Sequence, residues 1–161
     1  MKARLTSLVI ATILAAAIAA PALAAEARPF VGRFTAQAGP AEPRCGANAL
    51  TLGFEISGTA SHLGSLTGTG SNCTEFTLAT EAVDVWDGLA TFVAADGSTI
   101  TTAAEGAQGA PIAGRAPFLI EHTVTGGTGR FAGASGIWEV SGIIDFTTGQ
   151  IDGEVSGWLA Y

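Results

Sequence analysis

Apolar and polar residues alternate with a period of two along most of the chain beyond residue 29, and glycine-rich turns interrupt the alternation. Successive side chains of a β-strand point to opposite faces, so this pattern predicts strands with one buried and one exposed face. In the first run, for example, Phe30, Gly32, Phe34 and Ala36 share one face. Acidic residues fall repeatedly on the opposite face, as an antiparallel sheet with one dry and one wet side requires.

Helices are not predicted beyond the first 25 residues. No long window there has apolar residues spaced as on a helix face, and glycine, threonine and serine, which are poor helix formers, are dense. We therefore expect about eight or nine antiparallel strands. The clearest runs are 30–36, 50–57, 90–94, 98–104, 118–124, 138–146 and 151–161.

Turns and loops separate these runs. Hairpin turns are predicted at 95–98, which contains Asp-Gly, and at 147–150. Segments 39–48 and 105–117 are predicted to be loops because prolines and glycines punctuate them. Closing such a sheet removes its exposed edges, so the predicted fold class is all-β, an antiparallel β-barrel. A two-layer β-sandwich is the alternative with the same strand count.

The first 24 residues have the layout of a secretory signal peptide. Lys2 and Arg4 give a basic start, residues 8–20 form an uninterrupted apolar run, and Ala22 and Ala24 supply a small-x-small cleavage site. The apolar run is shorter than the roughly 20 residues that span a bilayer as a helix, although a retained membrane anchor is the alternative. We expect residues 1–24 to be cleaved. Residues 25–161 would then be one exported domain, in the periplasm or the extracellular medium, without stable membrane insertion.

The expected exported domain is strongly acidic. It would keep five arginines, no lysine and 14 acidic residues, and so carry a net charge of −9. Such a surface is a poor partner for nucleic acid and for anionic lipid. Cys45 and Cys73 are the only cysteines, and in an oxidising compartment they are expected to form a disulfide. Two thiols and two distant histidines give no compact chelating motif, so neither a metal nor a cofactor is predicted.

The most specific string is the glycine-rich segment 125–136, TGGTGRFAGASG. It is predicted to be a tight connection in which Gly126 and Gly127 can take positive φ and Phe131 can anchor the turn on the core. A phosphate-binding loop is disfavoured, because Walker-type spacing and its lysine are absent and no helix is expected to follow.

This string resembles the G-G-T-G-x-F-x-x-A-x-G signature of the dirigent and allene oxide cyclase barrels. The surrounding pattern, over residues 48–161, is similar to exported bacterial members of that superfamily. The resemblance implies an eight-stranded antiparallel barrel with a central apolar cavity, often trimeric. In plants such barrels steer radical coupling or cyclise an unstable fatty-acid epoxide. The residues that transfer to this chain do so as a structural turn: Gly126, Gly127, Gly129, Arg130, Phe131, Gly133 and Gly136.

Two histidines are the candidate catalytic residues. His122 shares the apolar face of its run with Phe118 and Ile120, so it is expected to point into the barrel, where an imidazole can serve as an acid or base. The alternative is a buried histidine satisfied by a neighbour. His62 lies in a Gly/Thr-rich run and is the second candidate.

Aromatic residues are the candidate ligand contacts. Trp138 and Phe118 lie on apolar faces, and Tyr161, the only tyrosine, ends the last run. Trp158 falls on a polar face and is expected to be an exposed patch or a subunit contact.

The predicted function is non-catalytic: an exported barrel that binds a small apolar ligand in its cavity. The alternatives are an isomerase or cyclase, in which His122 polarises a substrate, and a structural or interaction module of the cell envelope. Ordinary hydrolase chemistry is disfavoured because there is no G-x-S-x-G elbow and both cysteines are expected to be paired. The acids at Glu81, Asp84 and Asp87 match no calcium-loop spacing and are expected to be solvated.

Overall fold

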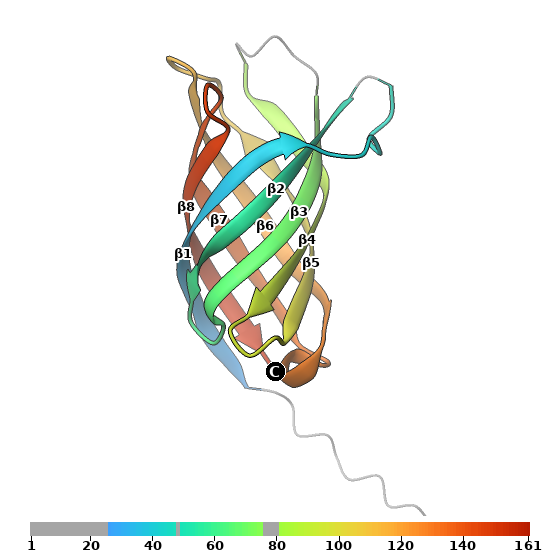
Figure 1. The fold of residues 1–161 in the computed structure, drawn as a ribbon, viewed down its shortest axis with the longest axis vertical. Helices are drawn as coiled ribbons and strands as arrows, with labels where there is room; N and C mark the ends of the chain where they lie inside the picture. Colours follow the sequence, from blue (N-terminus) through green and yellow to red (C-terminus); the bar gives the residue numbers. More distant parts are fainter. Residues whose placement is uncertain (1–25, 48, 76–80) are drawn as a thin grey trace, which may run out of the picture.

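The structure is a computed structural model that describes residues 26–47, 49–75 and 81–161. The predicted signal peptide lies outside the described residues and stays a prediction. The described chain forms one closed barrel of eight antiparallel strands in sequence order (Figure 1). The strands are β1 (Ala27–Pro40), β2 (Ala49–Ala60), β3 (Gly64–Glu75), β4 (Val83–Ala94), β5 (Thr99–Gln108), β6 (Arg115–Gly127), β7 (Ser135–Asp145) and β8 (Gln150–Ala160).

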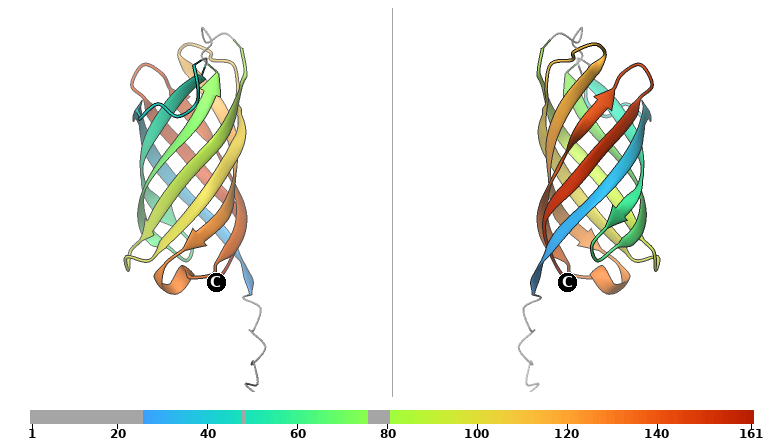
Figure 2. Two further views of the ribbon diagram at one scale, coloured as in Figure 1. Left: turned by 90° about the vertical axis from the view of Figure 1, so that its right-hand side faces the viewer. Right: turned by 90° about the vertical axis from the view of Figure 1, so that its left-hand side faces the viewer.

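Pairing of the first strand with the last closes the sheet. The β1–β8 ladder runs from the pair Ala27–Ala160 to the pair Gln37–Gln150, and the two strands lie side by side in Figure 2. Each strand is thus bonded on both sides, which leaves no edge for pairing with another chain. The barrel prediction is confirmed, and the β-sandwich alternative is excluded.

Helical structure in the described residues is limited to a short 3-10 turn, η1 (Gly129–Phe131). No helix within the described ranges is long and apolar enough to cross a membrane.

The predicted loop at 105–117 is wrong in extent. Strand β5 continues to Gln108 and β6 begins at Arg115, so the connection spans only residues 109–114. Gly106, which suggested a turn, lies in the ladder opposite Ile120. A Cβ on Gly106 would lie 2.2 Å from the Leu119 carbonyl oxygen, so this glycine permits close strand approach rather than a turn. The predicted loop at 39–48 is likewise shorter, because β1 extends to Pro40.

Glycines inside the barrel face large aromatic side chains on neighbouring strands. Trp138 on β7 is the register partner of Gly157 on β8, and Phe34 on β1 is paired with both Gly58 and Gly153. A Cβ on Gly157 would lie 2.6 Å from the Cβ of Trp138, and one on Gly153 would lie 2.6 Å from the Phe34 ring. At these positions glycine therefore makes room for an aromatic ring on the neighbouring strand.

Apolar side chains are buried at the end of the barrel where β8 ends, which is the lower end of Figure 1. Leu63, Ile100, Phe131 and Leu159 are each at most 2% exposed. Phe131 belongs to η1, which folds beneath the barrel in both views of Figure 2. Phe131 is fully buried there.

Arg130 fastens the turns of this lower end to one another. Its guanidinium donates to the His62 carbonyl oxygen of the β2–β3 turn and lies 3.2 Å from the Asp96 carboxylate of the β4–β5 turn. The expected positive φ at Gly126 and Gly127 is wrong, because both residues belong to the end of β6. Left-handed values occur instead at Gly129 (60°) and Gly133 (80°).

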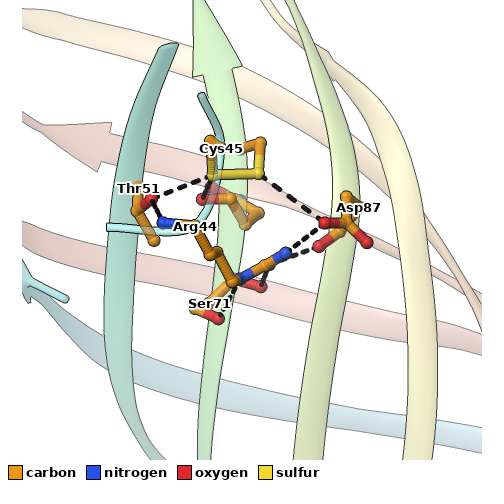
Figure 3. Close-up of polar contacts among 7 residues, drawn as sticks. Arg44, Cys45, Thr51, Ser71 and Asp87 are labelled. Atoms are coloured by element: carbon orange, nitrogen blue, oxygen red, sulfur yellow. Dashed lines mark hydrogen bonds and ion pairs between the residues drawn. A yellow bond between two sulfur atoms is a disulfide. The ribbon is translucent and has the colours of Figure 1, made fainter. Parts of the chain in front are cut away.

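A strap formed by residues 41–47 follows β1 in sequence and lies against the outer face of β3 and β4 near the upper end. The predicted disulfide between Cys45 and Cys73 is confirmed, with a Cα–Cα distance of 5.5 Å, and it ties the strap to β3. Beside it, Arg44 donates to Ser71 of β3 and pairs with the carboxylate of Asp87 on β4 (Figure 3). Asp87 lies where the register between β4 and β5 shifts, so the strap covers an irregular part of the sheet.

Glycine 157 offers a test of the aromatic packing. We expect Gly157→Ala to lower the free energy of unfolding by about 1–3 kcal/mol, because its Cβ would overlap Trp138 and the Ile137 carbonyl. The matched control is Gly39→Ala, where a Cβ meets nothing within 4 Å. Urea denaturation of the two variants checks this, and equal effects would contradict the account.

Removing the disulfide tests how far the strap depends on it. We expect the Cys45→Ala, Cys73→Ala double variant to lose roughly 3.6 kcal/mol of unfolding free energy, the chain-entropy value for a separation of 28 residues. Chemical denaturation with and without a reductant is the measurement. The reductant should destabilise the wild-type protein alone. A loss below about 1 kcal/mol would show that the strap does not need the covalent link.

Candidate ligand cavity

A cavity of about 130 Å³ lies inside the barrel, and all eight strands contribute to its lining. An engineered cavity of about 150 Å³ with a similar apolar lining binds benzene or xenon, so the volume here suits about one substituted benzene ring. The described lining is mostly apolar: Phe30, Phe34, Ala36, Leu52, Phe54, Ile56, Leu63, Leu66, Val85, Ala90, Phe92, Ala104, Phe118, Ile120, Trp138, Val140, Ile144, Ile151 and Val155 contribute aliphatic or aromatic side chains.

His122 lies on the inward face of β6, and its ionisable side chain lines this cavity. Its ring stacks on Trp138, with centroids 5.9 Å apart and planes within 10°, and meets the edge of Phe92 at 5.9 Å. The register explains the contact, because His122 pairs directly with Trp138 across β6 and β7. The sequence-based placement of His122 inside the barrel agrees with the structure, while its functional role stays a prediction.

Thr102 on β5 is hydrogen-bonded to His122. Thr102 is only 1% exposed. Its hydroxyl oxygen lies 2.9 Å from Nδ1 of His122, and no other side chain of the described residues is hydrogen-bonded to it. Nδ1 of a neutral ring can accept the proton of this buried hydroxyl, and we infer that Thr102 donates to Nδ1. The ring proton then resides on Nε2, and His122 carries a donor rather than an acceptor at that position.

Burial keeps the imidazole neutral. Removal from water disfavours the charged ring and lowers the pKa of His122 from 6.5 to about 4. At neutral pH the cavity therefore holds an uncharged N–H donor among apolar and aromatic side chains, and no fixed positive charge at this position.

The other sequence-based candidates divide between the cavity and the lower end. Phe118 and Trp138 line the cavity, as expected for ligand contacts. Tyr161 does not line it: its ring packs edge-on against Phe131 at 4.9 Å and its hydroxyl lies 3.3 Å from Nδ1 of His62. The other ring nitrogen of His62 lies 3.0 Å from the Pro29 carbonyl oxygen. The structure thus brings Tyr161 and His62 together, away from His122.

Trp158 lies on the outer surface, as its position in the alternation predicted. It is 40% exposed and is flanked in the register by Pro29 on β1 and Ile137 on β7. Ile137 is also exposed, so the outer wall carries an apolar patch near the lower end. A homo-oligomer that uses this patch stays a prediction.

The acidic residues at the upper end differ in their contacts. Asp87 pairs with Arg44, and Asp84 is exposed on the outer side of β4. Among residues 26–47, 49–75 and 81–161, no group of three or more histidine, cysteine, aspartate or glutamate side chains is placed to hold a metal ion.

Sequence reasoning missed the polar lining on β3. Asn72 and Thr74 face the cavity, with Leu52 and Leu50 as their partners on β2. The run 64–75 holds a single large aliphatic residue, Leu66, so it shows no clear alternation. Counting every second residue onward from Leu66 would have placed both side chains on the inner face.

Comparison with known proteins supports the fold and leaves the activity open. No protein-family model matches the sequence, and no curated protein is significantly similar to it. A solved structure, that of the pterocarpan synthase dirigent protein PsPTS1, is similar, with a TM-score of 0.53 and 16% sequence identity. The match covers 84% of this chain and 96% of that protein. The chain therefore has a closed eight-stranded barrel similar to that of a dirigent protein.

The low pKa of His122 predicts a pH dependence of stability. The unfolded chain protonates this ring near pH 6.5, whereas the folded protein keeps it neutral down to about pH 4, so acid favours unfolding over this range. We expect wild-type protein to lose about 2–3 kcal/mol more than His122→Phe between pH 7 and pH 4.5. Urea denaturation at both pH values measures this difference.

His62→Gln is the matched control, because it removes the other histidine, which lies outside the cavity lining. This variant should keep the wild-type dependence on pH. If the His122→Phe and wild-type proteins respond alike to pH, His122 is not held neutral by burial.

Proposed function

We propose that the barrel binds a small, mostly apolar ligand in its cavity and orients it by one hydrogen bond from Nε2 of His122. The observation that carries this proposal is the position of the His122 imidazole, stacked on Trp138, in a largely apolar cavity. Ligand pockets commonly combine apolar walls with a few placed polar groups in this way. An N–H donor selects a ligand with an oxygen acceptor, such as a carbonyl.

We place this function outside the cytoplasm, in the periplasm or the extracellular medium. The Cys45–Cys73 disulfide supports this location, since such bonds persist in oxidising compartments. The first 24 residues support it independently through their signal-peptide pattern.

A second candidate is an isomerase or cyclase that acts on a bound carbonyl compound. It is favoured by the same His122, because a neutral imidazole N–H polarises a carbonyl without transferring a proton. The similar solved barrel is that of a pterocarpan synthase. We rank binding first because acid–base chemistry needs a partner group, and the described lining offers no carboxylate or tyrosine beside His122.

Isothermal titration with acetophenone and ethylbenzene tests the proposed function. The two molecules have nearly the same shape, and acetophenone alone offers an acceptor. Both should bind, and acetophenone should bind about 2- to 12-fold more tightly, the value of one net hydrogen bond. His122→Phe should abolish that difference while it preserves an aromatic ring beside Trp138.

A pair of variants on β5 shows whether binding occurs inside the barrel. Ala104 lines the cavity, whereas Ala107 is exposed on the outer face. Ala104→Leu should abolish binding of both probes by filling the cavity, and Ala107→Leu should leave it unchanged. Binding that survives Ala104→Leu, or no binding of either probe to wild-type protein, would refute the proposal.

A further inference from the structure

The inner wall carries a second polar position, at Asn72 and Thr74 of β3. Both side chains line the cavity. The carboxamide oxygen of Asn72 and the hydroxyl of Thr74 are buried, and neither has a hydrogen-bond partner among the described residues. Thr74 is only 7% exposed. Buried polar atoms without partners cost free energy in the empty protein, so two of them on one strand face require an explanation.

The contacts of β3 with its neighbours give no structural reason for polar side chains at Asn72 and Thr74. The neighbouring Cys73 faces outward and is held by the disulfide to the strap, and the backbone of β3 is bonded to β2 on both sides of Asn72. Valine or leucine would satisfy the same inward positions without loss of a hydrogen bond. The two side chains follow one another at an interval of two residues, so they point to the same side and can converge on one ligand atom.

We propose that Asn72 and Thr74 form a hydroxyl-binding subsite, and that the ligand is an apolar molecule with a carbonyl at one end and a hydroxyl at the other. This proposal rests on the binding function proposed above. A hydroxyl suits the pair because it donates to the Asn72 oxygen while it accepts from the Thr74 hydroxyl. The ligand carbonyl accepts from His122 at the other position.

The register gives the spacing between the two positions. His122 pairs with Ala104, which pairs with Gly88, and Asn72 lies on β3 between residues paired with Leu89 and Trp86 of β4. Three strand-to-strand steps of about 4.8 Å separate the two backbones, roughly 14 Å along the curved wall. The side chains of both positions reach inward from the wall, so we match the proposed ligand to this spacing as one ring with two opposed polar groups. The cavity volume of about 130 Å³ sets the same limit.

Four para-substituted benzenes of nearly equal shape test this proposal. They are 4-hydroxyacetophenone with both groups, 4-methylacetophenone with the carbonyl, 4-ethylphenol with the hydroxyl, and 4-ethyltoluene with neither. Titration calorimetry at pH 6.5 should show that replacing the ring methyl group by hydroxyl tightens binding about 2- to 12-fold, for one net hydrogen bond, with and without the carbonyl.

Thr74→Val is the matching variant, since it replaces the hydroxyl by a methyl group. It should abolish the gain from the hydroxyl and leave the affinities of 4-methylacetophenone and 4-ethyltoluene unchanged. It should also raise the denaturation midpoint of the empty protein, because a buried hydroxyl without a partner is removed. Thr69→Val, on the exposed face of the same strand, is the control and should change none of the affinities.

The outcomes separate this proposal from the one it rests on. If 4-ethyltoluene and 4-methylacetophenone bind but the hydroxyl gives no gain, the cavity binds ligands and the Asn72–Thr74 subsite is refuted. If Thr74→Val lowers the denaturation midpoint, its hydroxyl has a structural partner and the subsite is also refuted. If none of the four probes binds the wild-type protein, the binding function and the subsite both fail.

Discussion

The width of an eight-stranded barrel limits how the interior of this molecule can be filled. Eight strands enclose an interior that side chains can just fill, or that can hold one small ligand. Which of the two occurs depends on the sizes of the inward residues. In this chain the large inward aromatics, such as Phe34 and Trp138, face glycines on the neighbouring strands. The rings are therefore accommodated at the wall, and a central volume of about 130 Å³ stays unfilled.

The two ends of the barrel differ in ways that follow from this interior. At the lower end Phe131 and its apolar neighbours seal the core, and Arg130 joins three turns to one another. The polar lining residues Asn72 and Thr74 lie higher on β3, near its connection to β4 and on the strand that the disulfide secures from outside. His122 lies between these regions. The interior thus offers a largely apolar lining with hydrogen-bonding groups at His122 and at Asn72 and Thr74, an arrangement that can orient an elongated small molecule.

Alternation in the sequence predicted the fold and the inward position of His122, because strand periodicity directly determines which face a side chain occupies. It failed where glycine has more than one role. Gly106 suggested a loop, yet it serves close approach between strands, which depends on Leu119 of the neighbouring strand, and Gly127 instead makes room for Phe131 and for Thr99 of β5. Thr102 could not be linked to His122 for the same reason, since the β5–β6 register creates that contact. Asn72 and Thr74 were missed because β3 has few apolar residues to reveal its inner face.

The central claim is that the barrel interior accepts a ring-sized apolar molecule beside Trp138 and His122. A crystal structure of the protein exposed to iodobenzene tests it most directly, because the iodine atom is located by its anomalous scattering. The account predicts an anomalous peak inside the barrel, within contact distance of the Trp138 ring. A well-ordered structure in which the interior is filled by side chains, with iodine only at the outer patch around Trp158, would contradict it.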